Sequence, residues 1–248
     1  MALALTLLTA CGADEPKPPV TGDITEKNVP QVCALLEEAG LSNTDVFEAW
    51  VKASASDAAG GGSGSGGFSD ADCRMTVMLL AGDLIRYGSL EESYAGSYLM
   101  FDTDAIENDD RYDALKSKEG LFTTMFGEMP IPESGFADAL PQKWGGHGIR
   151  VESDKCAVIS IVFKAYAQEE AFVGHTGLLI DCRGSEAVDA DYVFVEKLAF
   201  GDPFRITAVK DENELLALLS ARPDYTVEDG EPAPVVYKNT ERIGELKQ

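Results

Sequence analysis

The segment that most constrains the fold is an apolar run in the second half of the chain. Residues 156–166 (CAVISIVFKAY) contain four Val or Ile residues, and branching at Cβ favours the extended backbone of a strand. Similar runs occupy residues 175–183 and 192–198. Only residues 167–174 separate the first two runs, which predicts that they form an antiparallel hairpin. An amphipathic helix is predicted over residues 212–221, so this half combines antiparallel sheet with helix.

The first half begins with helical patterns. Asn28 is a favoured capping residue before residues 29–39, whose apolar side chains form one stripe, and Gly40 can end that helix. Residues 42–45 (SNTD) form a second start signal and predict a short helix after them. Residues 51–57 alternate in polarity, so they fit either a continuation of that helix or a strand.

The middle of the chain carries weaker signals. Residues 73–80 (CRMTVMLL) are predicted as a strand, with further short strands over residues 83–87 and 97–101. Residues 103–118 are polar and are predicted to contain a surface helix. Residues 59–67 (AGGGSGSGG) are predicted as a flexible loop, and they lack the G-K-[ST] sequence of a phosphate-binding loop.

Together these patterns predict an α+β fold in which helices pack on antiparallel sheets. Residues 69–77 and 152–160 both place a cysteine at the start of a predicted strand after acidic residues, which suggests two related α+β units. We therefore expect an N-terminal unit over residues 23–140 and a C-terminal unit over residues 141–248. At 248 residues, the chain is long enough to bury a core in each unit.

The N-terminus carries the clearest indication of location. Residues 1–10 (MALALTLLTA) are uncharged, too short to span a bilayer, and typical of the apolar part of a secretory signal. The sequence Leu8, Thr9, Ala10 and Cys11 follows the pattern of a bacterial lipobox, in which the cysteine is acylated and becomes the new N-terminus. Because no Lys or Arg precedes this short segment, we expect the true start to lie upstream.

The chain therefore resembles bacterial lipoproteins. The lipobox, with a cysteine-containing helix at residues 32–36 (VCALL), resembles actinobacterial cell-envelope lipoproteins of unknown function. The resemblance implies that residues 1–10 are a signal-peptide remnant and that residues 11–22 are the lipidated cysteine and a Pro-rich tether. It places the protein on the outer face of the cytoplasmic membrane, with membrane lipid as a partner of Cys11.

The cysteine count agrees with export to an oxidising compartment. Beyond Cys11 the chain has four cysteines, namely Cys33, Cys73, Cys156 and Cys182. An even number predicts two disulfides, and four cysteines allow three connectivities. We favour Cys33–Cys73 and Cys156–Cys182, because each pair closes a loop within one half of the chain. A zinc site is disfavoured, since the chain has no CxxC spacing and only two histidines.

Charge limits the classes of partner. The chain has 43 acidic and 20 basic residues and a net charge of −23, so a nucleic acid would be repelled. The hydrophobic fraction of 45% is too high for a disordered protein. We expect a neutral or basic envelope protein, or a small ligand, as the partner.

The densest group of candidate ligands for a metal is the acidic segment at residues 102–113. It contains six acidic residues, and oxygen ligands at this density suit Ca²⁺. The segment departs from a calcium-binding EF-hand loop, because Ile106 takes the fifth position, Glu107 replaces the glycine and Asp113 takes the twelfth. A solvated acidic surface is favoured, with a weak calcium-responsive protein as the alternative.

No motif of nucleophilic catalysis is present. The sequence lacks G-x-S-x-G and the serine–lysine patterns of acyl transfer. His147, in a glycine-rich stretch beside Trp144, is the candidate for lining a pocket, and an envelope hydrolase that uses His147 or carboxylates is one alternative. His175 opens a predicted strand and is interpreted as a strand-edge residue. A ligand groove is a further hypothesis, formed by Phe163, Tyr166, Phe172, Tyr192 and Phe194.

The leading hypothesis is a non-enzymatic binding or interaction module at the cell envelope. It rests on the lipid anchor with its tether, the small α+β units and the lack of a recognisable catalytic motif. We expect no catalytic residues, no cofactor and no bound metal.

Overall fold

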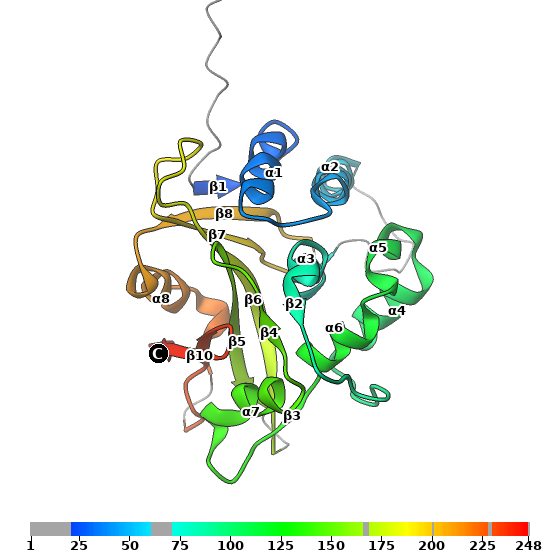
Figure 1. The fold of residues 1–248 in the computed structure, drawn as a ribbon, viewed down its shortest axis with the longest axis vertical. Coiled ribbons are helices and arrows are strands. Elements are labelled where there is room, and N and C mark those ends of the chain that lie inside the picture. The colour runs from blue at the N-terminus through cyan, green and yellow to red at the C-terminus, as the bar shows by residue number, and fades with distance from the viewer. Residues whose placement is uncertain (1–20, 61–70, 166–168, 200, 228–229, 248) are drawn as a thin grey trace, which may run out of the picture.

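An antiparallel sheet lies at the centre of the computed structural model, which describes residues 21–60, 71–165, 169–199, 201–227 and 230–247 (Figure 1). Among these residues, eight strands join in one sheet of order β1-β8-β7-β6-β5-β9-β10, and β3 pairs with β6 beside this path. The strands are β1 Thr21–Asp23, β3 Met129–Pro130, β5 Cys156–Lys164, β6 Glu170–Asp181, β7 Tyr192–Lys197, β8 Phe204–Val209, β9 Val235–Lys238 and β10 Glu241–Glu245. A separate pair joins β2 Ile85–Arg86 to β4 Arg150–Val151.

The predicted strands of the second half are confirmed as β5, β6 and β7, and β5 and β6 form the predicted antiparallel hairpin. The predicted α+β class is confirmed as well. The α-helices are α1 Val29–Glu38, α2 Thr44–Gly60, α3 Cys73–Ala81, α4 Met100–Asn108, α5 Asp113–Lys116, α6 Glu119–Phe126, α7 Ala139–Gly146 and α8 Glu212–Ser220. Short 3₁₀ turns are η1 Gly82–Leu84, η2 Asp110–Tyr112, η3 Phe136–Asp138 and η4 Pro223–Tyr225.

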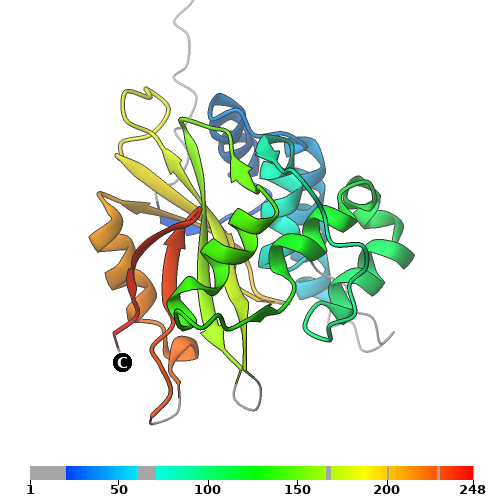
Figure 2. The ribbon, with the colours of Figure 1, turned by 60° about the horizontal axis from the view of Figure 1, so that its bottom comes forward.

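Helices cover both faces of the sheet. Figure 2 shows α1 to α6 on one side and α8 on the other. On strand β5, Val158 and Val162 belong to the core that faces the first group of helices. Ile159 and Ile161 belong to the smaller core beneath α8. Because both faces of β5 are buried, its sequence is a continuous apolar run instead of an alternating one.

Two helix predictions at the N-terminus are confirmed, with one local difference. Residues 51–57 continue helix α2, which settles the alternative that the sequence left open. Asn28 occupies the capping position of α1, but its side chain does not cap the helix. Its Oδ1 instead accepts a hydrogen bond from Thr25 N at 2.7 Å. The C-terminal helix is capped as its sequence indicates, since the Asp211 carboxylate accepts from Glu214 N at 2.9 Å.

The strand predicted over residues 73–80 is wrong, because this segment is helix α3. The Asp72 carboxylate accepts a hydrogen bond from Met75 N at 2.7 Å and so caps the first turn. Every residue of α3 except Arg74 is buried, so apolar side chains occur on all sides and hide the helical period. The proposed repeat with residues 152–160 lacks its structural basis, since one cysteine starts a helix and the other starts a strand.

The other weak segments also differ from the prediction. Only Ile85 and Arg86 of residues 83–87 form a strand, and Met100 starts helix α4 within the strand predicted at 97–101. The helix expected within residues 103–118 is present as α4 and α5. The loop predicted at 59–67 lies mostly outside the described residues.

One buried core continues across the predicted boundary between residues 140 and 141. That boundary falls inside helix α7, and the larger core contains Leu36 and Phe122 together with Val158 and Val195. The first half also supplies strands β1 and β3, which pair with β8 and β6. Thr21 and Gly22, predicted as the end of the tether, therefore belong to the sheet instead. Both halves therefore contribute to a single sheet.

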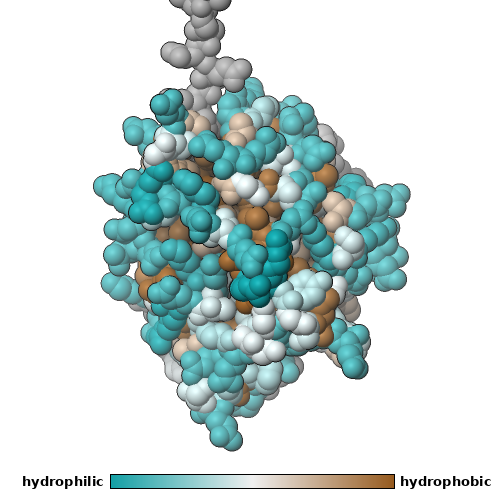
Figure 3. Space-filling model, in the orientation of Figure 1, coloured by the Kyte–Doolittle hydropathy of each residue, from teal (hydrophilic) through white to brown (hydrophobic). Residues whose placement is uncertain are grey.

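The surface seen in Figure 3 is mostly polar, and apolar residues reach it in small patches. In the part of the chain that the structure describes, each helix is too short or too polar to cross a membrane.

The cysteines differ from the prediction: Cys33, Cys73, Cys156 and Cys182 are buried free thiols. Cys156 pairs with Ile180, which precedes Cys182 by two residues. The last two cysteines are therefore diagonal neighbours, and diagonal residues lie about 7–8 Å apart in antiparallel strands. A disulfide usually needs Cα atoms within about 4.4–6.8 Å, so this register does not favour the bond.

The other predicted pair faces different elements. Cys33 Sγ donates to the carbonyl oxygen of Thr44 at 3.3 Å, whereas Cys73 lies against the backbone of Thr176 on β6. Burial is the main reason that the pKa rises to about 11 for Cys33 and about 12 for Cys73. Both thiols therefore stay protonated at neutral pH and are poor nucleophiles.

Candidate functional site

A buried group of charged side chains lies on the α8 side of the sheet. Glu196 on β7 has a fully buried side chain, and His175 on β6 is 2% exposed. His175 Nε2 lies 2.7 Å from Glu196 Oε2. Arg222, which follows α8, donates from Nη1 to the same oxygen at 2.8 Å and from Nη2 to Oε1. Both carboxylate oxygens are thus satisfied, as a buried charge requires.

The strand register brings these residues together. Glu196 pairs with Gly177 on β6, so His175 is its diagonal neighbour on the same face. A Cβ atom at position 177 would lie 2.6 Å from the ring of Phe194, so the strands can approach here only because position 177 is glycine. Arg222 reaches the pair from the short connection between α8 and η4, which Pro223 starts.

The surroundings keep the Glu196 carboxylate ionised. Burial by itself would raise the pKa of Glu196, but hydrogen bonds from His175 and Arg222 lower it below its ordinary value. Because a carboxylate only accepts hydrogen bonds, His175 Nε2 carries the proton of the bond to Glu196. Arg222 Nη1 also donates to the Tyr225 hydroxyl at 3.0 Å, which fixes the next aromatic side chain.

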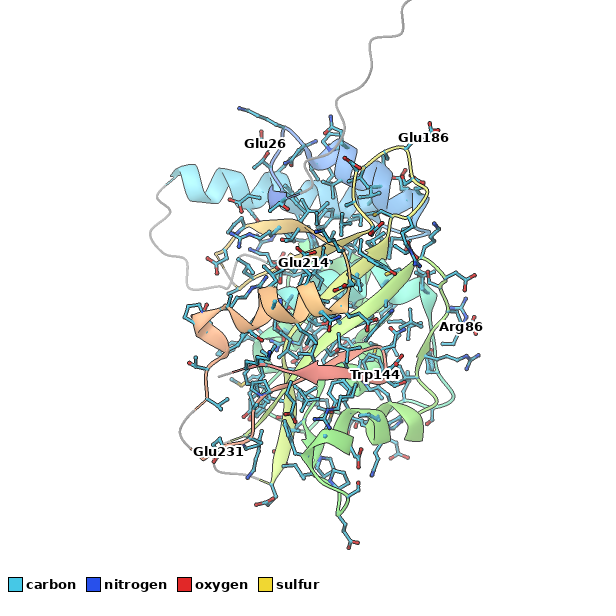
Figure 4. All side chains as sticks on the ribbon, turned by 90° about the vertical axis from the view of Figure 1, so that its left-hand side faces the viewer. Glu26, Arg86, Trp144, Glu186, Glu214 and Glu231 are labelled. Atoms are coloured by element: carbon cyan, nitrogen blue, oxygen red, sulfur yellow. The ribbon has the colours of Figure 1, made fainter. Side chains whose placement is uncertain are left out.

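A cavity of about 550 Å³ opens beside this group and is lined in part by His175 and Arg222. Its apolar lining includes Phe163, Phe172, Leu198, Pro223, Tyr225 and Val227. Its other charged residues are Lys164, Asp202, Arg205, Asp224 and Glu231. Figure 4 shows Glu231 at the lower end of the molecule, on the segment that leads toward β9, and Glu214 on helix α8 above it.

Aromatic rings form one wall of the cavity. The rings of Phe163 and Phe172 are stacked with centroids 5.8 Å apart, and Phe163 meets Tyr225 edge-on at 6.1 Å. Gly174 is the extra residue where the register between β5 and β6 shifts. A Cβ atom there would lie 2.5 Å from the Phe163 ring, so this glycine lets both phenylalanine rings pack over the strand.

His147, the histidine that the sequence singled out, lies elsewhere. It follows α7, and its Nδ1 is 3.3 Å from Ser89 Oγ. It lines a second cavity of about 530 Å³ with Glu91, Glu128 and Lys143. Among the bonds of the described residues, none joins His147 to a carboxylate that would orient its ring. The hydrolase alternative therefore rests on the single serine contact.

Lys143 beside this second cavity is already occupied. Its Nζ donates to the carbonyl oxygens of Gly127 and Glu128 at 3.1 and 3.2 Å, and it lies 3.2 Å from Glu91 Oε1. Burial lowers its pKa, with the charge of Glu91 acting in the opposite direction. This lysine therefore ties loops together and has no donor left for a substrate.

The acidic residues at 102–113 do not converge. Asp102 is buried against Arg74, Asp104 accepts from Asn108, and Asp109 pairs with Arg111. Among the described residues, no group of three or more His, Cys, Asp or Glu side chains is arranged to hold a metal ion.

The predicted aromatic groove is present only in part. Phe163 and Phe172 line the first cavity, whereas Phe194 is buried in the core and Tyr192 lines a separate, smaller hollow. Tyr166 and the predicted lipidation site Cys11 lie outside the described residues.

The residues at the centre of the site were not predicted from the sequence. Glu196, Arg222 and Tyr225 were not singled out, and His175 is buried instead of lying at a strand edge. One signal was available, because Glu196 and Lys197 stand inside an otherwise apolar strand. A charged side chain in such a strand must find a buried partner.

The chain matches a family described as a domain of unknown function, DUF4300, over residues 63–243. This match covers most of the chain, which therefore belongs to the DUF4300 family, and it includes every residue of the buried charged group and the cavity. None of the curated proteins and none of the solved protein structures matches the chain.

The buried ion pair yields a first prediction. Glu196→Gln should lower the free energy of unfolding by about 3–5 kcal/mol, because Arg222 stays buried without an opposite charge. Urea denaturation followed by circular dichroism measures this change. Glu152→Gln is the control, since Glu152 pairs with Arg86 and Arg150 at the surface and should change stability by less than about 1 kcal/mol. Equal effects of the two substitutions would contradict this role of Glu196.

Asp102 yields a prediction on pH. Burial, followed by the charge of Asp72, raises the pKa of Asp102 to about 8 from an ordinary value of 3.8. The native carboxyl therefore keeps its proton where the unfolded chain has lost it, so its contribution to stability falls as pH rises from about 4 to 8. Asparagine has nearly the same shape as the protonated aspartic acid but does not titrate. Asp102→Asn should therefore flatten the loss of stability between pH 5 and 8.

The melting temperature as a function of pH measures this difference. Asp104→Asn, on the exposed side of the same helix, serves as the control and should keep the wild-type slope. An unchanged slope in Asp102→Asn would show that this carboxyl does not hold its proton in the native state.

Proposed function

We propose that this member of the DUF4300 family is a lipid-anchored envelope protein that binds a small, largely apolar ligand without transforming it. The observation that carries the proposal is the aromatic-walled cavity of about 550 Å³ beside the His175–Glu196–Arg222 group. Small-molecule sites are commonly clefts of roughly 300–1,000 Å³ with apolar walls and a few fixed polar groups, and this cavity has that composition.

The polar groups of the cavity support binding over catalysis. Glu196 accepts bonds from both His175 and Arg222, so its charge is used within the protein. The two hydroxyl groups of this wall are also engaged, because Tyr225 accepts from Arg222 and Thr226 donates to the carbonyl oxygen of Pro223. Neither hydroxyl is hydrogen-bonded to His175, as an activated nucleophile would be.

The location rests on the sequence. The lipobox ending at Cys11 and the Pro-rich residues 13–20, which precede strand β1, would hold the folded part of the chain near a membrane surface, where a binding pocket can collect a ligand. The acidic surface would keep it soluble beside the membrane.

The pocket can be tested with the neutral fluorescent probe N-phenyl-1-naphthylamine, whose emission rises in apolar surroundings. We expect saturable binding to one site. Ala199, an exposed residue of the cavity lining, offers a position at which a large side chain fills the cavity from its rim. Ala199→Trp should weaken probe binding by at least about tenfold, the loss expected when about 1.4 kcal/mol of contact is removed.

Ala34→Trp provides the matched control, because Ala34 is exposed on helix α1 and lies outside the cavity lining. It should bind the probe as the unmodified protein does. Non-saturable binding, or equal affinity in the two tryptophan variants, would contradict a binding site in this cavity.

The anchor is tested separately in cells. The chain is expressed behind a complete bacterial lipoprotein signal, with and without Cys11→Ala. The unmodified protein should fractionate with membranes, since several acyl chains on one N-terminus hold far better than one. The variant should move to the soluble fraction, and equal partition of both forms would exclude Cys11 as the anchor.

A further inference from the structure

Acidic side chains outnumber basic ones in and around the cavity. Each basic residue of the lining has an acidic partner: Arg222 binds Glu196, Lys164 lies 3.8 Å from Glu231, and Arg205 lies 3.4 Å from Asp23. Two acidic residues of the lining, Asp202 and Asp224, make no side-chain hydrogen bond or ion pair with any described residue. The cavity and its immediate partners therefore carry an excess of negative charge.

The backbone holds these two carboxylates in place. The carbonyl oxygen of Asp202 accepts a hydrogen bond from the buried ammonium group of Lys197. Asp224 lies within η4, the 3₁₀ turn that also carries Tyr225 and follows the ion-paired Arg222. Both carboxylates are thus on segments fixed by buried charges, while the carboxylates themselves are exposed.

The aromatic wall has matching electrostatics. The rings of Phe163 and Tyr225 meet at an interplanar angle of 62°, so they form a corner, and Phe172 stacks beside Phe163. The face of an aromatic ring is negative and attracts a cation within about 6 Å. The Tyr225 ring already receives one cation, since the Arg222 guanidinium carbon lies 5.6 Å from its centroid.

An anion fits these surroundings poorly. It would meet the two unpaired carboxylates and the faces of the rings, while the basic side chains are already engaged. The overall charge of −23 adds a long-range field that concentrates cations and repels anions. Arg205 Nε is buried without a hydrogen-bond partner, but the guanidinium charge is still paired with Asp23.

We propose that the ligand of this cavity is an organic cation, an ammonium group attached to an apolar body. The charge lies against Phe163 and Tyr225 beside Asp202 and Asp224, and the apolar part fills the remainder of the cavity. This inference rests on the proposed function, since it names the chemical class of the ligand for the same site.

A cation, a neutral molecule of the same shape and an aromatic anion test the charge. Phenyltrimethylammonium, its neutral isostere tert-butylbenzene and the anion benzoate compete with N-phenyl-1-naphthylamine for the full chain. We expect the cation to bind at least about fivefold more tightly than the neutral isostere, as cation–π contacts and carboxylates require, and benzoate to bind least. The preference for the cation should shrink as salt concentration rises.

Two variants localise the effect. Asp202→Asn/Asp224→Asn should lower the ratio of cation affinity to neutral affinity by about fivefold or more. Asp189→Asn/Asp191→Asn is the matched control, because it removes two exposed acidic residues that do not line the cavity. This control changes the net charge by the same amount and should keep the ratio. Phe163→Leu, which removes an aromatic ring from the cavity, should lower the ratio.

The outcomes separate the two proposals. Equal binding of the cation and tert-butylbenzene, or tighter binding of benzoate, would overturn the cation inference and leave the binding function standing. An equal loss of the ratio in the cavity variant and its control would also overturn the inference, because the preference would then reflect the global field. If none of the probes binds saturably, the binding function itself fails.

Discussion

Glu196 is a fully buried carboxylate in the middle of a β-sheet, and much of the surrounding structure follows from the need to satisfy it. Its two oxygens require donors, which His175 supplies from the neighbouring strand and Arg222 from the end of α8. The interaction therefore fixes the position of α8 against the sheet. Since η4 follows directly, the same bonds also place Tyr225 in the wall of the cavity.

A second buried group of charges lies close by along β6. Arg74 on α3 lies near the carboxylates of Asp72 and Asp102 and donates to the carbonyl oxygen of Val173. His175 is two residues further along, and Gly174 between them is the bulged residue of the strand. The bulge thus lies between one charged group that attaches the N-terminal helices and another that attaches α8. This arrangement concentrates the polar interactions of the interior at the end of β6 where the cavity opens.

Much of the fold could be predicted from local patterns, because some segments carry signals that depend only on neighbours in sequence. Branched side chains in residues 156–166, with a short connection to the next run, specify an antiparallel hairpin wherever it is placed. Asp211 caps α8 through a bond to a backbone group three residues away. The segment at 73–80 carries a similar local signal in Asp72, which caps α3 through Met75 N. Burial on all sides of α3 nevertheless removed the period that distinguishes a helix from a strand.

The sequence by itself determined the α+β class, the central strands, the terminal helices and the acidic surface, because each depends on side-chain shape, capping or charge within a short stretch. Only the tertiary structure decided which residues form the site. His175 and Glu196 are 21 residues apart and Arg222 follows 26 residues later, so no local pattern relates them. Their association arises from strand register and from the packing of α8, which bring together groups that must be paired once they are removed from water.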